Sequence, residues 1–222
     1  MNLIYATNHP KFIDRIVIKK RKEMVNIINN QLEDYSFSTA LDIGTTNDIE
    51  NESSNYLIKN IKNIKVFKSL SDQKIDSKFF SKILNKSITD ELSENEILTF
   101  SSDVVISNAT IEHVGSLKNQ IKKISNIIKL IKKIFIITTP NRYHPIDFHT
   151  KIPLVHWLPK KIHRKVLSLL GLNFFAKEEN LNLFSKNNLK FLLSHFQNIE
   201  YKIHHIKLMN FKSNFIIIGK VI

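Results

Sequence analysis

Two kinds of hydrophobic pattern alternate along this chain. Residues 15–32, 117–132 and 185–196 place apolar side chains about every third or fourth position among polar ones, which predicts amphipathic helices. Residues 40–44 and 135–139 are short apolar runs without polar alternation. Such runs are typical of strands covered on both faces of a mostly parallel sheet. The pattern therefore predicts helices packed against a buried sheet.

Weaker signals fill the intervals between these elements. They predict further helices at 55–61 and 159–170 and further strands at 64–67, 87–90, 103–108, 200–209 and 214–221. The order is one helix, then alternating strands and helices, then a pair of strands. It predicts an α/β three-layer sandwich with a Rossmann-like, mostly parallel seven-stranded sheet and an antiparallel last strand. Residues 1–222 are expected to form one domain, with 1–38 as an N-terminal helical segment.

The charge of the chain suggests an anionic partner, but the kind of cation argues against specific nucleic-acid recognition. The net charge is +13 and the isoelectric point is near 9.7, which is compatible with binding to nucleic acid or an anionic membrane. Only four of the 33 basic residues are arginine, the side chain on which specific phosphate and base recognition depends. We interpret the charge as mainly solvated surface, with 19–22 and 160–165 as candidate basic patches.

Cysteine is absent, which excludes a disulfide framework and cysteine-ligated zinc. No run of about 18 apolar residues predicts a membrane span, and residues 1–10 lack the order of a secretory signal. We therefore expect a soluble, cytoplasmic protein without a transmembrane segment.

The segment 140–156 concentrates chemically versatile side chains directly after the apolar strand 135–139. It contains three prolines, three histidines, one arginine, one tyrosine and one aspartate. Open α/β sheets bind ligands beyond the carboxyl ends of their strands, which is where this loop is expected. The alternative is a packed surface loop that its prolines merely stiffen.

Residues 41–44, 102–114 and 139–159 carry three motifs that together resemble class I S-adenosylmethionine-dependent methyltransferases of the type 11 family. Residues 41–44 (Leu-Asp-Ile-Gly) resemble the acidic residue and glycine turn that follow the first strand of that family. Residues 102–114, which include Glu112 and His113, resemble the fourth strand and the Glu-His that opens the next helix. Residues 139–159 resemble a subgroup with Pro-Asn-Arg after the fifth strand. Thr45 and Thr46 stand where further glycines are usual, which restricts the turn.

The resemblance implies S-adenosylmethionine as cofactor and assigns residues to it. The backbone of the first turn would approach the cofactor, and the acid after the second strand would bind its ribose. The acid near the third strand would lie near its adenine, and the end of the fourth strand would lie beside its methionine portion. The residues so assigned are Asp42, Gly44, Thr45, Thr46, Asp72, Asp90, Ser107 and Asn108. For Asp90, a solvated loop aspartate is the alternative.

The resemblance also places the acceptor beside residues 140–184, an acceptor-side insertion. Candidate catalytic residues are His113, His149 and Arg142, and candidate substrate-binding residues are Asn141, Arg142, Tyr143 and His144. Arg142, Tyr143 and His149 are expected to face the cofactor's methyl group. No metal ligand is assigned, although histidine–carboxylate metal sites remain possible without cysteine. The acceptor would be a small molecule or a molecule related to cell-surface glycans or lipids. Alternatives are a catalytically inactive methyltransferase-like binding or scaffold protein, an RNA methyltransferase, and histidines that only pack.

Overall fold

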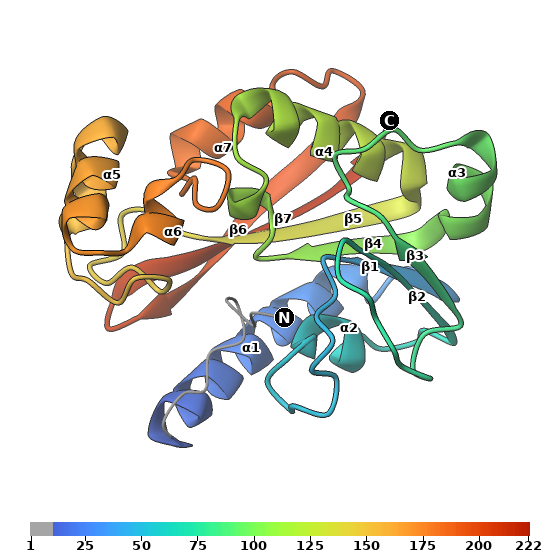
Figure 1. Cartoon of the computed structure of the whole chain (residues 1–222). Coiled ribbons are helices and arrows are strands. Elements are labelled where there is room, and N and C mark those ends of the chain that lie inside the picture. Colours follow the sequence, from blue (N-terminus) through green and yellow to red (C-terminus); the bar gives the residue numbers. More distant parts are fainter. Residues whose placement is uncertain (1–10) are drawn as a thin grey trace.

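The computed structural model describes residues 11–222 as a seven-stranded sheet with helices on both faces (Figure 1). The strands are β1 (Thr39–Ile43), β2 (Val66–Ser71), β3 (Lys82–Asn85), β4 (Ser102–Asn108), β5 (Ile131–Pro140), β6 (Ile199–Leu208) and β7 (Phe211–Val221). The helices are α1 (Lys11–Leu32), α2 (Tyr56–Asn60), α3 (Glu94–Phe100), α4 (Leu117–Leu130), α5 (Lys160–Leu169), α6 (Asn173–Ala176) and α7 (Lys186–Leu193). Two short 3-10 turns are η1 (Ile111–His113) and η2 (Val155–Trp157).

The sheet order is β3-β2-β1-β4-β5-β7-β6. Strands β3, β2, β1, β4 and β5 pair in parallel, whereas β7 is antiparallel to both of its neighbours, β5 and β6. The predicted mostly parallel sheet with an antiparallel last strand is confirmed. From β1 the chain first moves outward to β2 and β3 and then returns to the other side of β1 with β4. The reversal lies between β1 and β4, and open α/β sheets bind ligands at the carboxyl ends of the strands at such a position.

Both faces of the sheet are buried, which explains the unbroken apolar runs. In β5, Phe135 and Ile137 pack on one face with α4 and α7, while Ile134 and Ile136 pack on the other with α1 and α2. In Figure 1 the first pair of helices lies above the sheet and the second pair below it. Because neighbouring strand residues point to opposite faces, a strand between two helix layers needs apolar residues at every position.

The predicted position of the third strand was wrong, and helix α3 was not predicted. Residues 87–90 were predicted as the strand, but β3 is Lys82–Asn85 and 88–90 form a turn. Strand β3 lies at the sheet edge, where Ile83 is exposed, so its hydrophobic signal is weak. Helix α3 begins with a capping box in which Ser93 and Glu96 bond to each other's backbone amides. The residues around this cap are mostly polar, so the hydrophobic pattern did not predict the helix.

Other boundaries moved by a few residues. Helix α1 begins at Lys11, before the predicted start at 15, and β5 begins at Ile131, before the predicted start at 135. The short helix α6 lies within the insertion and was not predicted. Part of the predicted N-terminal segment 1–38, residues 1–10, lies outside the described residues.

Residues 140–184 leave the sheet after β5 and return beside their starting point. Asn141 forms a bridge with Phe184, and the amide of Arg142 donates to the Phe184 carbonyl at 2.8 Å. Between these points the chain builds η2, α5 and α6 at one end of the molecule, on the left of Figure 1. Among the helices of residues 11–222, none has the length and apolar character needed to cross a membrane.

Candidate functional site

The turns that follow β1 and β4 touch each other at the carboxyl edge of the sheet. Gly44 has a φ of +85°, and a Cβ atom placed on it would lie 2.3 Å from Cγ2 of Thr110. The amide of Gly44 donates to the Leu70 carbonyl of β2 at 2.8 Å. Glycine is therefore required here twice, for its backbone angle and for the close approach of Thr110.

Side-chain hydrogen bonds hold the first turn in place of the missing glycines. The Thr45 hydroxyl is fully buried and donates to Asp42 Oδ2 at 2.7 Å, while Ser69 donates to Thr45 Oγ1 at 2.8 Å. Ser71 donates to the Thr45 carbonyl at 2.7 Å. Burial raises the pKa of Asp42 to about 6, although the Thr45 bond opposes the rise. These hydrogen bonds fix this half of the turn, and the Thr45 hydroxyl is used as both donor and acceptor within it.

The second half of the turn is closed by Asn55. Its Oδ1 accepts from the Thr46 amide at 3.0 Å, and its Nδ2 donates to the Thr46 carbonyl at 2.9 Å. Asn55 adopts a left-handed backbone with φ of 50° to do so. The predicted cofactor residues Asp42 to Thr46 thus form one continuous turn.

The end of β4 lies directly beside this turn. Ser107 shares a 2.6 Å hydrogen bond with Thr110, and Asn108 Oδ1 accepts from Thr138 of β5 at 2.6 Å. Ala109 has a left-handed φ of 50°, and its amide donates to the Thr138 carbonyl. The structure therefore places Ser107 beside the first turn, whereas Asn108 bonds to β5, and their role in binding the cofactor stays a prediction.

The two predicted carboxylates stand in different positions. Asp72 is exposed and directly follows β2, whose last residue is Ser71. It is therefore nearer to the end of the strand than the predicted strand, 64–67, had suggested. Asp90 is also exposed, in the turn before α3, and its carbonyl accepts from Asn126 at 2.8 Å. No strand carries Asp90 to the edge, so its link to the adenine stays a prediction.

Lys123 is a buried cation that the sequence interpretation did not select. It is fully buried, and its Nζ donates to Thr110 Oγ1. Burial lowers its pKa to about 7, although the charges of Glu112, Asp72 and Asp42 oppose the shift. The helical spacing could have shown that Lys123 is buried. The buried residues of this helix face follow the i, i+3, i+4, i+7 pattern and are Gln120, Lys123, Ile124 and Ile127.

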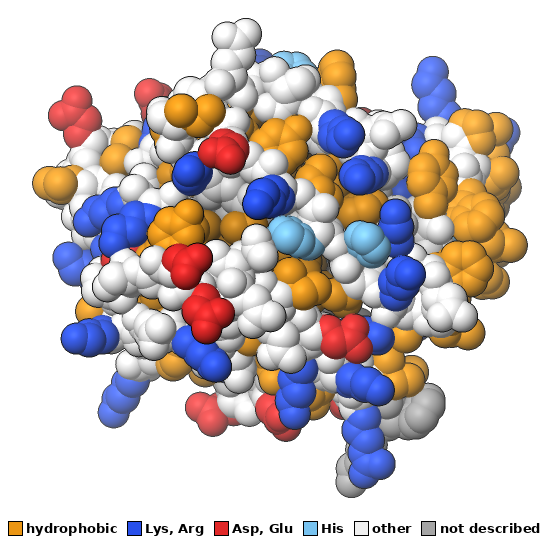
Figure 2. All heavy atoms as spheres, turned by 180° about the vertical axis from the view of Figure 1, so that it is seen from behind, with side chains coloured by type: hydrophobic (Ala, Val, Ile, Leu, Met, Phe, Trp, Pro, Cys, Tyr) orange, Lys and Arg blue, Asp and Glu red, His pale blue; other side chains and the backbone are white. Residues whose placement is uncertain are grey.

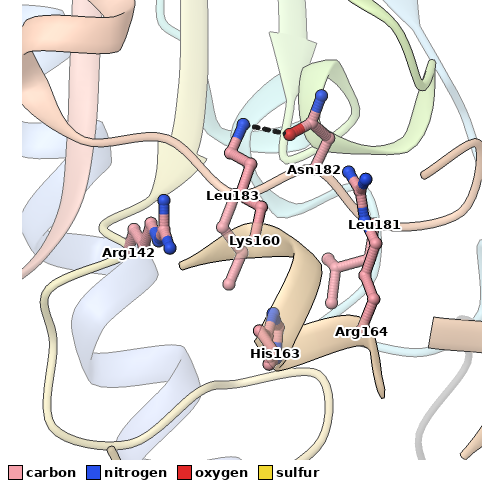
Figure 3. A pocket seen from close by; sticks show the side chains of 7 residues that line it. All are labelled: Arg142, Lys160, His163, Arg164, Leu181, Asn182 and Leu183. Atoms are coloured by element: carbon pink, nitrogen blue, oxygen red, sulfur yellow. Dashed lines mark hydrogen bonds between the residues drawn. The ribbon is translucent and has the colours of Figure 1, made fainter. Parts of the chain in front are cut away.

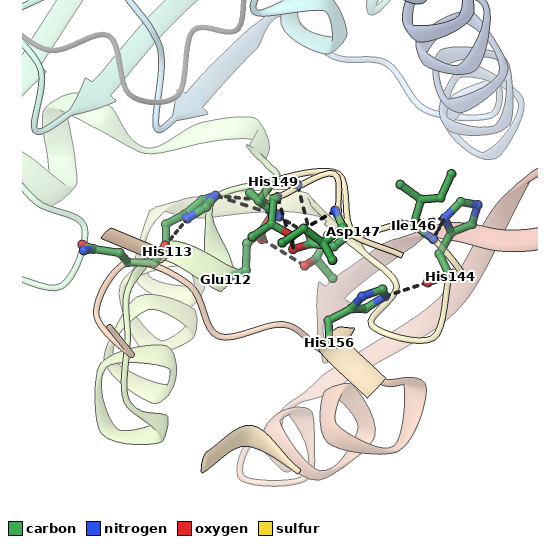
Figure 4. A network of polar contacts seen from close by, with 11 residues as sticks. Glu112, His113, His144, Ile146, Asp147, His149 and His156 are labelled. Atoms are coloured by element: carbon green, nitrogen blue, oxygen red, sulfur yellow. Dashed lines mark hydrogen bonds and ion pairs between the residues drawn. The ribbon is translucent and has the colours of Figure 1, made fainter. Parts of the chain in front are cut away.

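Glu112, His113 and His149 meet beyond the ends of β4 and β5 (Figure 4). The Nε2 atoms of the two histidines lie 3.2 Å apart, and each lies 4.0 Å from Glu112 Oε1. Thr139 of β5 donates to Glu112 Oε2 at 2.9 Å. Two of these residues come from the turn after β4 and the third from the loop after β5. The structure thus joins both candidate catalytic histidines in one cluster.

A hydrogen bond at Nδ1, on the side of the ring away from the cluster, orients each histidine. His113 Nδ1 lies 2.6 Å from the Asn180 carbonyl, and His149 Nδ1 lies 3.1 Å from Asp147 Oδ1. Burial lowers the pKa of His113. Burial also disfavours the charged form of His149, but the bond and charge of Asp147 outweigh it and raise the pKa of His149. Asp147, also bound by Thr150 at 2.7 Å, was not selected from the sequence.

The other predicted acceptor residues mostly bind their own loop. Arg142 donates through Nε to the His156 carbonyl at 2.9 Å and through Nη2 to the Leu158 carbonyl at 2.6 Å. Asn141 Nδ2 donates to the Lys212 carbonyl at 2.8 Å. His144 is buried with Nδ1 at 2.9 Å from the Ile146 carbonyl, and Tyr143 is 53% exposed. Of these and His149, the Glu112 cluster contains His149 alone, so the other acceptor roles stay predictions.

Arg142 also lines a small basic pocket (Figure 3). The pocket is lined by Arg142, Lys160, His163, Arg164, Leu181, Asn182 and Leu183. Lys160 Nζ donates to Asn182 Oδ1, and the Asn182 amide donates to the Glu112 carbonyl at 2.7 Å. Burial, assisted by the charges of Arg142 and Arg164, lowers the pKa of Lys160. Cations that repel one another in this way favour the binding of an anion. Asn182 connects the pocket to the Glu112 cluster, because it bonds both to Lys160 and to the Glu112 carbonyl.

On the face shown in Figure 2, Lys and Arg side chains are spread among acidic and apolar ones and are not gathered into one patch. The basic residues that line the pocket of Figure 3 all belong to the insertion 140–184.

Comparison with known proteins identifies the fold. No family model and no curated protein matches the chain. Among solved structures, the N-methyltransferase NodS from Bradyrhizobium japonicum with S-adenosylhomocysteine has a TM-score of 0.56 at 10% identity, over 97% of this chain and 93% of that one. The magnesium protoporphyrin IX methyltransferase from Synechocystis, also with S-adenosylhomocysteine, has a TM-score of 0.58 at 11% identity, over 98% and 90%.

A third similar structure is the 1,6-didemethyltoxoflavin-N1-methyltransferase of Burkholderia thailandensis with 1,6-didemethyltoxoflavin and S-adenosylhomocysteine. Its TM-score is 0.57 at 8% identity, over 97% of this chain and 92% of that one. These similarities over nearly whole chains show that the protein has the class I methyltransferase fold.

Proposed function

We propose that this protein is an S-adenosylmethionine-dependent methyltransferase of type 11 character. The observation that carries the proposal is the contact between Gly44 and Thr110, which places the first turn and the end of β4 against each other at the reversal of the sheet. Ligands bind at this position in open α/β sheets. Structures with the same fold and S-adenosylhomocysteine bound support the choice of cofactor.

In this proposal the cofactor lies along the carboxyl edge of β2, β1 and β4. The backbone from Gly44 to Thr46 faces it, and Asp72 at the end of β2 accepts from its ribose hydroxyls. Ser107 and Asn108 lie beside its methionine portion. Lys123 supplies a buried positive charge beneath the same edge and suits the cofactor's carboxylate.

The reaction would be an in-line attack by an acceptor oxygen, nitrogen or carbon on the sulfonium methyl. The bond from carbon to sulfur breaks, and its electron pair stays on sulfur. Positioning two substrates can lower such a barrier by on the order of 7 kcal/mol or more. For a hydroxyl acceptor, His113 or His149 is placed to take the proton, and Arg142 holds the loop that carries His149.

Calorimetric titration with S-adenosylmethionine tests the cofactor. We expect saturable binding of one molecule per chain. Asp72→Asn should weaken it about tenfold, because a hydrogen bond to a charged group is lost. The matched control is Asp76→Asn, which changes a nearby exposed acid. Equal affinity of the two variants would contradict the placement of the ribose.

A catalytically inactive binding or scaffold protein is the second candidate. It is favoured by the first turn, where side-chain bonds of Thr45 replace the freedom of glycines. The same titration separates the two candidates, since an inactive fold should show no saturable heat with either S-adenosylmethionine or S-adenosylhomocysteine.

For the acceptor we propose a small or glycan- or lipid-related molecule with an acidic or phosphorylated group. Arg142, Lys160 and Arg164 around the small pocket beside Asn182 suit such a group by their charge. Exposed apolar side chains around α5 suit an apolar portion, and they include Trp157, Leu158, Ile162, Leu169 and Leu170. Transfer of labelled methyl groups to a panel of acceptors tests this. Preferential methylation of RNA would contradict it.

A further inference from the structure

Glu112 is a buried carboxylate with one oxygen left without a hydrogen bond. Its side chain is fully buried, and Thr139 donates to Oε2 at 2.9 Å. Within residues 11–222, no group donates to Oε1. A carboxylate oxygen that has lost its water must be compensated by a cation or a proton. The charge of Lys123 acts on Glu112, but Lys123 does not donate to Oε1, which therefore lacks a direct partner among these residues.

The nearest groups to Oε1 that could share such a partner are two imidazole nitrogens. His113 Nε2 and His149 Nε2 each lie 4.0 Å from Oε1 and 3.2 Å from each other. A tetrahedral ion with bonds of about 2.1 Å holds its ligand atoms roughly 3.4 Å apart. The three atoms thus need only small movements to bind one ion.

The hydrogen bonds behind the rings decide which nitrogens can act as ligands. A carbonyl only accepts, so the 2.6 Å contact with Asn180 places a proton on His113 Nδ1. Asp147 likewise accepts from His149 Nδ1 at 3.1 Å. In neutral rings both Nε2 atoms then carry lone pairs directed at the centre of the cluster. A carbonyl or carboxylate behind each histidine is the usual support of metal-binding histidines.

We propose that Glu112 Oε1, His113 Nε2 and His149 Nε2 bind one divalent transition-metal ion. Two imidazoles and one carboxylate suit zinc, and also iron or manganese. The sequence had not selected this metal site, although it left histidine–carboxylate sites possible; His113 and His149 are 36 positions apart, and only the fold brings them together.

The ion would have two consequences. It would attach the loop after β5 to the turn after β4, since His149 belongs to one and Glu112 to the other. Three protein ligands also leave a coordination position for water or for an acceptor oxygen. With both Nε2 atoms bound, neither histidine could take the acceptor's proton, and the ion would instead lower the pKa of the bound oxygen. This second consequence rests on the proposed function, whereas binding of the ion itself does not.

Zinc titration of the full-length, chelator-treated protein tests the site. Calorimetry with Zn²⁺ alone should show one ion bound per chain at micromolar concentration or below, and Co²⁺ should give the visible absorption of a nitrogen- and oxygen-ligated ion. Glu112→Gln and His149→Asn should weaken zinc binding at least 100-fold. Asp147→Asn, which changes only the support of His149, should weaken it about tenfold. His195→Asn is the control, because His195 is an exposed histidine at the end of α7.

Circular dichroism checks that each variant folds, and the wild-type titration decides the matter even if a variant does not. Absence of saturable zinc binding to the wild type would overturn the proposal and leave a proton shared between the two histidines. Equal zinc affinity of the wild type and Glu112→Gln would overturn it as well. Titration with S-adenosylmethionine on the same metal-free protein is a separate readout, so failure of the metal site and failure of the cofactor site are distinguishable.

Discussion

Gly44 and the side chain of Thr110 contact each other so closely that Gly44 has no room for a Cβ atom, which would lie 2.3 Å from Thr110 Cγ2. The two residues follow neighbouring strands, β1 and β4, at the carboxyl edge where the strand order reverses. Their contact makes Gly44 the most sensitive position of the first turn.

Gly44→Ala should therefore destabilise the protein through two separate effects. The left-handed backbone costs about 1–2 kcal/mol for an alanine, and the overlap with Thr110 adds about 1–3 kcal/mol. Gly171→Ala is the matched control, because Gly171 has a φ of +77° but no atom within 4 Å of its added Cβ. Urea unfolding should show a clearly larger loss for Gly44→Ala. Similar losses would mean that Thr110 moves aside freely.

Thr45→Val should leave Asp42 without its main hydrogen bond. The Thr45 hydroxyl donates to the buried Asp42 carboxylate at 2.7 Å. Its removal should destabilise the fold by about 1–3 kcal/mol and raise the pKa of Asp42 further above about 6. Urea unfolding and an NMR titration of the Asp42 carboxyl measure the two effects. Thr45→Ser, which keeps the hydroxyl, should change both quantities far less.

The stability should depend on pH through Lys123. Burial lowers the pKa of its ammonium group from 10.5 to about 7. Between these values the unfolded chain binds one more proton than the folded chain, so the free energy of unfolding should rise with pH, by up to about 1 kcal/mol per unit.

Lys123→Met should remove this rise and make the protein more stable near pH 7. Lys122→Met, which changes the exposed neighbour on the same helix, should keep the rise. Urea unfolding at about pH 7, 8 and 9, with a chelator present, gives the comparison. The same slope in both variants would show that another group titrates.

Binding to nucleic acid should be weak, indifferent to sequence and steeply dependent on salt. Only four of the 33 basic residues are arginine, and bidentate guanidinium contacts are what reads bases and phosphates specifically. Fluorescence anisotropy with RNA and DNA at about 50 and 200 mM salt measures the dependence. A tight complex with one RNA that survives the higher salt would favour an RNA methyltransferase.

The sequence alone determined the elements whose signals are local. Residues 135–139 predicted a strand because a strand covered on both faces needs an apolar residue at every position, and 117–132 predicted a helix because its isoleucines recur at helical spacing. It did not reveal β3, because an edge strand with one face open to solvent needs few apolar residues. The backbone pairing that holds β3, such as Ser69 with Ile83, is made with another segment of the chain.

The tertiary structure decided which side chains meet. The motifs predicted that the turns after β1 and β4 and the loop after β5 carry functional residues, but local spacing does not fix distances between loops. The order β1-β4-β5 in the sheet brings their carboxyl ends together, and only then does His149 reach Glu112 and Thr110 reach Gly44. Lys123 shows the same division: the helix period puts it on the inner face, but its charge became informative only when burial and the neighbouring carboxylates were known.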